Sequence, residues 1–576
     1  MRKIYRNIVS VAAVVFLLLQ SSCVDTVILP DDKTVGEDFW QKKSDVSMIV
    51  NKAYQSMLST AMMQRLIIWS DFRSDELCYV TTLTGDVPND LEEIFAGQIQ
   101  TDNTFNSWTA MYSAINYCNM VLEKAKAVMS IDPNYTNGDY LADRSQMLAL
   151  RSLCYFYLVR VFRDVPYIEQ PYMSSSQDMN VEQTAPLAVI DSCITCLKEA
   201  ESTALKSTTY ADWRRVGYLT KDAIQAILAD IYLWRASVMH SAEDYQKCID
   251  YCDLIIESKK SQFTLRPGET EDPENPYHLS ECEDYYDDIF ADQNSYESIF
   301  ELQFDGSSNS NEGLCQMYNK YKNNNSTSGY LKASAYFSKS GTSQLYCRST
   351  LDQRMYESVY DANGAADLFD VRKMVATRGL GSAFGRSEAR TGRTYTSYNQ
   401  NWVVYRLTDI MLMKAEALVQ LINDDYDDSR ARVAFTLVQT VNTRALSSKL
   451  DSMKWNTYKA QHDLEGLVLE ERARELCFEG KRWFDLLRYN YRHVDGVNYA
   501  ETFKEQAANN NAAYVQNYSS MLDLMVQKYS TGGGAVKTKM PTEPYLYMPI
   551  AQDEIDVNPN LFQNPVYSER KDWTKK

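Results

Sequence analysis

Residues 471–486 read Glu-Arg-Ala-Arg-Glu-Leu-Cys-Phe-Glu-Gly-Lys-Arg-Trp-Phe-Asp-Leu and carry the strongest local pattern in the chain. Apolar positions recur there at alternating steps of four and three, which predicts one helix over residues 467–489 with a buried stripe. Gly480 has a low helix propensity, so we expect another backbone to approach it closely. The stripe consists of Leu469, Ala473, Leu476, Gly480, Trp483 and Leu487.

Two carboxylates, Glu475 and Glu479, lie four positions apart in this stretch. Paired carboxylates can serve as the general acid and the general base of an enzyme. Ion pairing with nearby arginines such as Arg474 or Arg482 is the preferred interpretation, because structural ion pairs also perturb carboxylates.

Helical periodicity continues outward on both sides. Segments 220–238 and 242–258 are separated by only a few residues, which predicts a hairpin of the tetratricopeptide type. Between about 261 and 402 Gly, Asn, Ser and Pro cluster, so we expect a large irregular insertion. The sequence therefore predicts an all-α fold of helical hairpins with large irregular loop insertions. The candidate helices lie near 45–64, 105–129, 141–163, 184–204, 220–238, 242–258, 406–421, 428–446 and 460–490.

The N-terminal residues predict export and lipidation. Residues 1–22 have a basic start and the apolar run Ile8–Leu19, which falls short of the roughly 20 residues that span a bilayer. Cys23 follows two small residues, as in a lipobox, although Gln20 stands where an aliphatic residue is usual. We expect lipidation of Cys23 and a tether over residues 23–44. The alternative is an ordinary signal peptide with an incidental cysteine.

The composition excludes several classes of function. Acidic residues (77) exceed basic ones (59), so a net charge of −18 disfavours nucleic acid as a partner. The four histidines have no zinc-site or triad spacing, which argues against metallohydrolase and serine-hydrolase chemistry. The C-x-x-C formed by Cys193 and Cys196 lies within a predicted helix, so we interpret it as packing.

One acidic cluster raises the question of calcium. Calcium takes carboxylate oxygens, but this cluster lacks the glycine and the spacing of an EF-hand. A solvated acidic face is the preferred interpretation, and we expect no cofactor. The cluster consists of Glu281, Glu283, Asp284, Asp287 and Asp288.

The stretch 471–486 resembles the signature of the SusD/RagB family of outer-membrane nutrient-binding lipoproteins. Four further segments resemble the family in the same order, and they are residues 150–166, 406–417, 441–445 and 549–565. Arg163, Ala551 and Val566 depart from the family's usual Gly, Pro and Gly.

The resemblance implies a helical fold with four tetratricopeptide-like hairpins as scaffold, and irregular loops that bind the ligand. It also implies a lipid-anchored protein on the surface of the outer membrane, which delivers a glycan to a SusC-like TonB-dependent transporter and does not cleave it. We expect an N-terminal helical region over residues 45–260 and a C-terminal region over residues 261–576.

Sugar recognition needs flat aromatic faces and polar groups for hydroxyls, often on loops held by a rigid frame. Two regions qualify: the loop that follows residues 69–73 and the insertion from Asn319 to Tyr346. The alternative is that each aromatic ring packs under its own loop. The candidate ligand-binding residues are Tyr79, Asn89, Asp90, Tyr321, Asn323, Asn324, Tyr330, Tyr336 and Phe337.

Other functions remain open at this point. The same architecture can import peptides, for which aromatic loops are equally suitable. A hairpin-repeat scaffold that binds only proteins would have no small-ligand pocket in the insertion. A glycosidase would need two carboxylates about 5–10 Å apart in one cleft, and no motif supports it.

Overall fold

The computed structural model describes most of the chain beyond residue 38. Contacts divide the chain into residues 40–172 with 178–576, and a small unit of residues 1–39 with 173–177. The larger unit carries the fold described below. The described residues are 39–174, 176–265, 270–318, 329–337, 345–346, 348–359, 370–375, 398–423, 429–458, 460–509, 520–525, 528 and 534–567.

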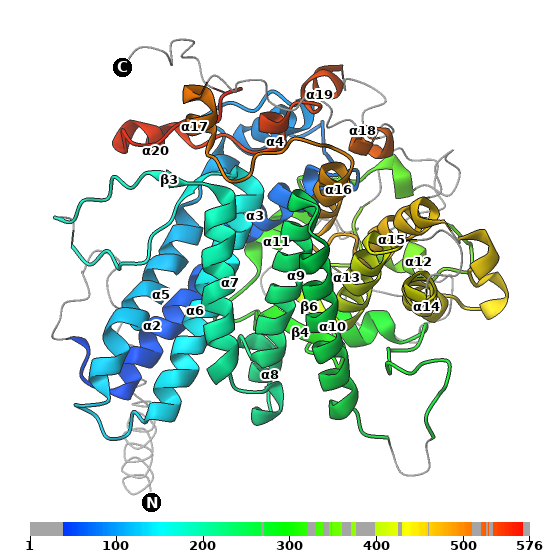
Figure 1. Cartoon of the computed structure of the whole chain (residues 1–576), viewed down its shortest axis with the longest axis horizontal. Coiled ribbons are helices and arrows are strands. Elements are labelled where there is room, and N and C mark those ends of the chain that lie inside the picture. The colour runs from blue at the N-terminus through cyan, green and yellow to red at the C-terminus, as the bar shows by residue number, and fades with distance from the viewer. Residues whose placement is uncertain are drawn as a thin grey trace, which may run out of the picture. The chain divides into compact units, whose positions relative to one another are not determined.

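Long helices packed side by side form the scaffold (Figure 1). Contacts run in order from α2 to α5, α6, α7, α9, α10 and α13, and α13 also packs against α14 and α15. The all-α prediction is therefore confirmed. The scaffold helices are α2 (Lys43–Ser56), α5 (Thr109–Val128), α6 (Asn137–Phe162), α7 (Pro186–Thr203), α9 (Lys221–Met239), α10 (Ala242–Gln262), α13 (Leu407–Gln420), α14 (Ser429–Arg444) and α15 (Gln461–Leu476).

The α9–α10 hairpin agrees with its prediction, and local chemistry explains its turn. Helix α9 ends at Met239, and His240 caps it with a left-handed φ of 52°. Ser241 then caps α10, because its hydroxyl accepts a hydrogen bond from the Asp244 amide at 3.2 Å. Ala226 and Ala229 are fully buried on α9, and such small side chains allow neighbouring helices to approach closely.

Two segments predicted as single helices are each divided in two. The segment 45–64 forms α2 and α3 (Thr60–Ile67), and the hydroxyl of Ser59 caps the second helix. The segment 460–490 forms α15 and α16 (Arg482–Arg492). Both predictions of unbroken helices are wrong, because apolar periodicity alone does not reveal a short turn between two helices that share a buried face.

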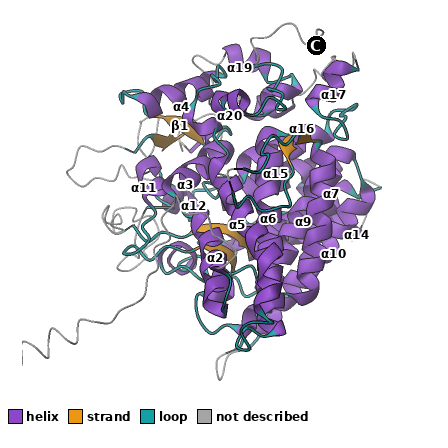
Figure 2. Ribbon diagram, turned by 90° about the vertical axis from the view of Figure 1, so that its left-hand side faces the viewer, coloured by secondary structure: helices purple, strands orange, loops and turns teal. Residues whose placement is uncertain are grey.

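Three short antiparallel strand pairs accompany the helices. In Figure 2, β1 lies beside α4 (Asp86–Ala96). The pairs are β1 (Leu77–Tyr79) with β5 (Leu331–Ala333), β2 (Val165–Pro166) with β3 (Gln183–Thr184), and β4 (Ser298–Leu302) with β6 (Trp402–Arg406).

The insertion between α10 and α13 is fastened to the scaffold at several points. Strand β4 pairs with β6, which leads directly into α13. Helix α11 (Glu312–Tyr318) packs so closely on α3 that a Cβ at Gly313 would lie 2.5 Å from the Thr60 carbonyl oxygen. The expected irregular insertion therefore contains short regular elements that hold it in place.

Short elements complete the described fold. Among the helices in the described ranges, none is both long and apolar enough to cross a membrane. The remaining helices are α8 (Arg214–Gly217), α12 (Arg354–Ser358), α17 (Phe503–Ala508), α18 (Ser520–Met525), α19 (Gly534–Lys539) and α20 (Gln552–Val557).

Candidate functional site

The stretch 471–486 forms a sharp turn between α15 and α16. Both Phe478 and Gly480 have positive φ, 63° and 76°, which ends the helical path predicted across this stretch. A Cβ at Gly480 would lie 2.8 Å from the ring of Trp402. The predicted close approach at Gly480 is therefore present, but it comes from an aromatic ring and serves a turn.

This turn docks on residues 71–76, which lead directly into β1. The Gly480 amide donates to the Asp71 carboxylate at 2.9 Å, and the Phe478 amide donates to Glu76 at 3.0 Å. Arg482 forms a two-pronged ion pair with Asp75, with distances of 2.8 and 2.9 Å. The turn therefore fixes the position of β1.

Burial dominates the electrostatics of this docking segment. Burial and, to a smaller extent, the nearby Glu479 carboxylate raise the pKa of Asp71 to about 8, against the lowering effect of the Gly480 amide. Burial and the neighbouring Asp71 also raise the pKa of Glu76 well above its usual range. The carboxyl groups of Asp71 and Glu76 therefore keep protons at neutral pH that they would release in the unfolded chain.

Glu475 lies in a buried cluster of arginines. Arg406 and Arg354 approach its carboxylate at 2.6 and 2.9 Å, and Arg444 pairs with it as well. Burial raises the pKa of Glu475, but Arg444, Arg406 and Arg354 outweigh it and hold the pKa well below its usual range. Such a carboxylate stays ionised and cannot act as a general acid.

Glu479 is ion-paired in the same way. Arg406 approaches it at 2.7 Å and Lys373 at 2.6 Å. The ion-pair interpretation of these two glutamates is confirmed, whereas the arginines named for it are wrong. Arg474 lies within α15 and pairs with Glu471 on the same helix, whereas the turn after α15 carries Arg482 to Asp75.

The β1–β5 pair brings the two predicted ligand-binding regions together. Tyr79 is the register partner of Leu331, and the Val80 amide donates to the Tyr330 carbonyl at 2.9 Å. The ring of Tyr79 meets Phe95 of α4 edge to face, with centroids 5.4 Å apart. Tyr330 precedes Leu331, so its side chain lies on the side of the strand pair opposite Tyr79. We call this strand pair, with the half-buried Tyr79 and Phe95 on one side and the half-buried Tyr330 on the other, the β1–β5 surface.

The first predicted region is not a loop, since it contains β1 and α4. Asn89 is exposed on α4, where a ligand has access to it. Asp90 accepts hydrogen bonds from the Thr104 hydroxyl at 2.5 Å and the Thr104 amide at 3.3 Å. Asp90 therefore serves the local structure of the chain.

Tyr336 and Phe337 of the second region are buried. The Tyr336 hydroxyl donates to the Leu524 carbonyl at 2.7 Å. Phe337 stacks between Tyr346 and Phe478, with centroids at 3.8 and 4.9 Å. The prediction that these two rings face a ligand is corrected, because both gain more from burial against the core. The predicted residues Tyr321, Asn323 and Asn324 lie outside the described residues.

Phe95 is a surface residue that is absent from the predicted candidates. It lies on α4, a helix in a region that the sequence predicts to be a loop. A signal was present, because Pro88 stands in the first turn and Leu91 and Ile94 follow at helical spacing.

The acidic cluster at 281–288 and the C-x-x-C show no metal geometry. Within the described ranges, no group of three or more His, Cys, Asp or Glu side chains is arranged to hold a metal ion. Cys193 is buried in α7 and is a free thiol, as is Cys196.

Comparison with known proteins places the two halves of the chain in one family. A family model described as "Starch-binding associating with outer membrane" matches residues 37–233, and one described as "SusD family" matches residues 369–567. The chain is 22% identical to the SusD-like protein P2 of Formosa agariphila, over 82% of this chain and 89% of that protein.

Solved structures share the fold. A SusD homolog from Bacteroides thetaiotaomicron aligns with a TM-score of 0.64 at 16% identity, over 92% of this chain and 97% of that one. The surface glycan-binding protein A from Bacteroides uniformis aligns with a TM-score of 0.61 at 18% identity, over 91% of this chain and all of that one. With family models matching on both sides of the insertion, the chain belongs to the SusD/RagB family.

Proposed function

We propose that this protein binds a glycan at the β1–β5 surface and delivers it to a SusC-like TonB-dependent transporter in the outer membrane. The observation that carries the binding site is the pairing of β1 with β5, which joins the two predicted ligand regions. Half-buried aromatic rings held by strands and a helix suit sugar stacking, because their rings are fixed before the ligand arrives.

The family relationship supports a carbohydrate as the ligand. One matched family model is described as starch-binding, and one structural neighbour is a surface glycan-binding protein. The net charge of −18 favours a neutral ligand over an anionic polymer at an open surface.

The proposed location is the cell surface, through a lipid on Cys23. The description of the matched N-terminal family model, which names the outer membrane, supports this placement. The transporter partnership follows from the family resemblance alone.

We further propose that the protein binds without cleaving. The buried carboxylates Glu475 and Glu479 support this, since both are committed to ion pairs. Release of reducing ends from a bound glycan would contradict this part of the proposal.

Affinity gel electrophoresis against a panel of polysaccharides tests the binding site. The full-length protein, extracted in detergent, should be retarded by at least one neutral polysaccharide. Because the two rings lie on opposite sides of the strand pair, the substitution on the side that the glycan contacts, Tyr79→Ala or Tyr330→Ala, should weaken binding about tenfold, since stacking of one ring on a sugar contributes roughly 1–1.5 kcal/mol. Tyr140→Ala, on a half-exposed tyrosine of α6, is the matched control and should bind as the parent does.

Two results would redirect the proposal. Retardation that survives both substitutions would place the glycan elsewhere on the molecule. If no polysaccharide retards the protein but the protein binds components of a peptide mixture, the ligand of this protein is a peptide.

A further inference from the structure

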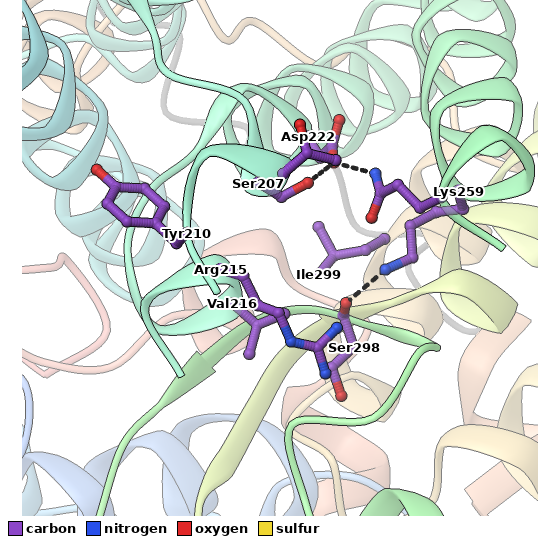
Figure 3. A pocket seen from close by; sticks show the side chains of 10 residues that line it. Ser207, Tyr210, Arg215, Val216, Asp222, Lys259, Ser298 and Ile299 are labelled. Atoms are coloured by element: carbon purple, nitrogen blue, oxygen red, sulfur yellow. Dashed lines mark hydrogen bonds between the residues drawn. The ribbon is translucent and has the colours of Figure 1, made fainter. Parts of the chain in front are cut away.

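A cavity of about 190 Å³ lies between the segment around α8, the start of α9, the end of α10, and β4 (Figure 3). None of the residues that line it belongs to β1 or β5. Its wall combines two basic side chains, one carboxylate and several hydroxyl groups. The polar residues of the wall include Ser207, Thr208, Tyr210, Arg215, Asp222 and Lys259.

Lys259 is a buried cation in this wall, with only 3% of its surface exposed. Its ammonium donates to the Ser298 carbonyl at 2.9 Å, which uses one of three hydrogens. Within the described ranges it forms no ion pair. Burial lowers the pKa of Lys259 to about 8, so the group remains mostly charged at neutral pH.

Arg215 supplies a second cation to the same wall. Its guanidinium donates to the Asn294 carbonyl, and it too lacks an ion pair among the residues that the structure describes. The two cations are close enough for Arg215 to disfavour the charged form of Lys259. A negative group placed between them would relieve this repulsion and occupy their remaining donors.

Asp222 does not fill this role, because its carboxylate is already occupied. It accepts hydrogen bonds from Ser207 at 2.7 Å, from Ser258 at 2.8 Å and from Gln262 at 3.0 Å. Among the residues that line the cavity, two cations face one carboxylate, while the buried carboxylates of Glu297 and Glu301 also favour the charged form of Lys259 from behind the wall. Glu297 pairs with Arg444, and Glu301 accepts hydrogen bonds from Ser298 and Asn401, so neither forms an ion pair with Lys259 or Arg215. The two cations can therefore hold one carboxylate between them.

The size and the hydroxyl groups narrow the ligand further. A single water needs about 10–15 Å³ of such space, so the cavity can hold on the order of a dozen non-hydrogen atoms. Ser207 and Thr208 offer hydroxyls that can exchange hydrogen bonds with hydroxyls of a ligand, whereas the Tyr210 hydroxyl points away from the cavity (Figure 3). A bare halide or a purely apolar acid would leave these groups unmatched.

We propose that this cavity binds a hydroxylated monocarboxylate of up to monosaccharide size, with its carboxylate held by Lys259 and Arg215. The carboxylate can belong to an acidic sugar or to a free hydroxy acid. The site shares no residue with the β1–β5 surface, so it stands or falls independently of the proposed glycan binding.

Isothermal titration calorimetry on the full-length protein in detergent tests the site with glucuronate, lactate and glucose. Glucuronate should bind, and glucose, which lacks the carboxylate, should not. Lys259→Met and Arg215→Gln should each weaken glucuronate binding at least tenfold. The matched control is Lys260→Met, because Lys260 follows on the same helix, pairs with Glu257 at 3.4 Å, and does not line the cavity.

The three ligands separate the possible sources of the carboxylate. Tighter binding of glucuronate than of lactate would identify an acidic sugar, and equal or tighter binding of lactate would identify a free hydroxy acid. Both results support the site. Binding of neither acid, or binding to Lys259→Met as tight as to the parent, would overturn it. Loss of structure cannot imitate the expected result, since the methionine variant should unfold at an equal or higher temperature.

Discussion

Gly480 allows the sharp turn between α15 and α16, and this turn fixes the position of β1 in the β1–β5 surface. It combines a φ of 76° with a ring of Trp402 that leaves no room for a Cβ. Its amide also donates a hydrogen bond to the carboxyl group of Asp71, six positions before β1 begins at Leu77. Backbone conformation, packing and hydrogen bonding therefore all require glycine here.

Gly480→Ala is expected to destabilise the protein by at least about 2 kcal/mol, because strain at positive φ adds to overpacking against the ring. Urea unfolding, followed by circular dichroism, measures the change. Gly466→Ala is the matched control, since nothing lies within 4 Å of its Cβ position in α15. That substitution should stabilise the helix by about 0.5–1 kcal/mol. Equal effects at both glycines would contradict the role given to the turn.

Lys259 illustrates a residue whose charge costs stability in the absence of a ligand. Lys259→Met should raise the free energy of unfolding by about 1 kcal/mol or more, because it removes a buried ammonium without an ion pair. The folded pKa of about 8 lies below the unfolded value of about 10.4, so the parent regains stability as the pH rises through this window. The advantage of methionine should shrink from pH 7 to pH 10, and a constant advantage would contradict the burial of a charge.

Among the elements, the docking of the α15–α16 turn on residues 71–76 connects the family's characteristic stretch to the candidate site. Three contacts made by Phe478, Gly480 and Arg482 hold the segment that leads into β1. The stretch that resembles the family signature is thus a structural support for β1, one strand of the candidate site.

The pH dependence of stability tests this docking. The folded pKa of Asp71, about 8, lies above its unfolded value of about 3.9. Its contribution to stability is complete below pH 4 and is lost as the pH rises toward 8. Asp71→Asn removes this titration and can still accept the Gly480 hydrogen bond, so its stability relative to the parent should increase between pH 5 and pH 8.

Urea unfolding of both proteins across this pH range measures the difference. Asp553→Asn, on an exposed carboxylate of α20, is the control for a general effect of charge. A stability difference between Asp71→Asn and the parent that stays constant from pH 5 to pH 8 would show that Asp71 is ionised in the folded protein as well.

The sequence predicted the elements better than the connections between them. The α9–α10 hairpin was predictable, because its periodicity and its short polar break are local signals. The turns after Ser56 and Leu476 were not, because the buried face continues on both sides of each turn. Helix α4 was missed in a region read as a loop, although Pro88 and its apolar spacing indicated it.

The candidate site was predictable as regions and only in part as residues. Tyr79 lies in β1 and Tyr330 directly precedes β5, whereas Phe337 and Tyr336 are buried by contacts with Phe478 and Leu524. Those contacts join positions far apart in the sequence. No local pattern distinguishes an aromatic ring that stacks on the core from one that faces a ligand.

At the scale of the whole molecule, the scaffold, the insertion and the proposed anchor are formed by different parts of the chain. The scaffold helices pack in sequence order, and β4 and α11 attach the insertion to them. The proposed anchor at Cys23 precedes all of these elements in the chain.

Cys23→Ser should move the protein from the membrane fraction to the soluble fraction of the cell, because multiple acyl chains are what would hold it durably at the membrane. Ultracentrifugation followed by immunoblotting measures the distribution. Cys196→Ser is the control, since this half-buried thiol in α7 is free and far from the N-terminus in sequence. Retention of Cys23→Ser in the membrane fraction would contradict lipid anchoring.

The pairing of Leu77 with Ala333 joins positions more than 250 residues apart, and this separation has a consequence for folding. A loop of that length closes at a high entropic cost, which must be recovered by contacts made beforehand in the scaffold. We therefore expect the hairpins to form first and the two halves of the β1–β5 surface to meet late. In a chain that has not yet paired β1 with β5, the proposed binding surface is incomplete. We therefore expect ligand binding to appear only when folding is complete.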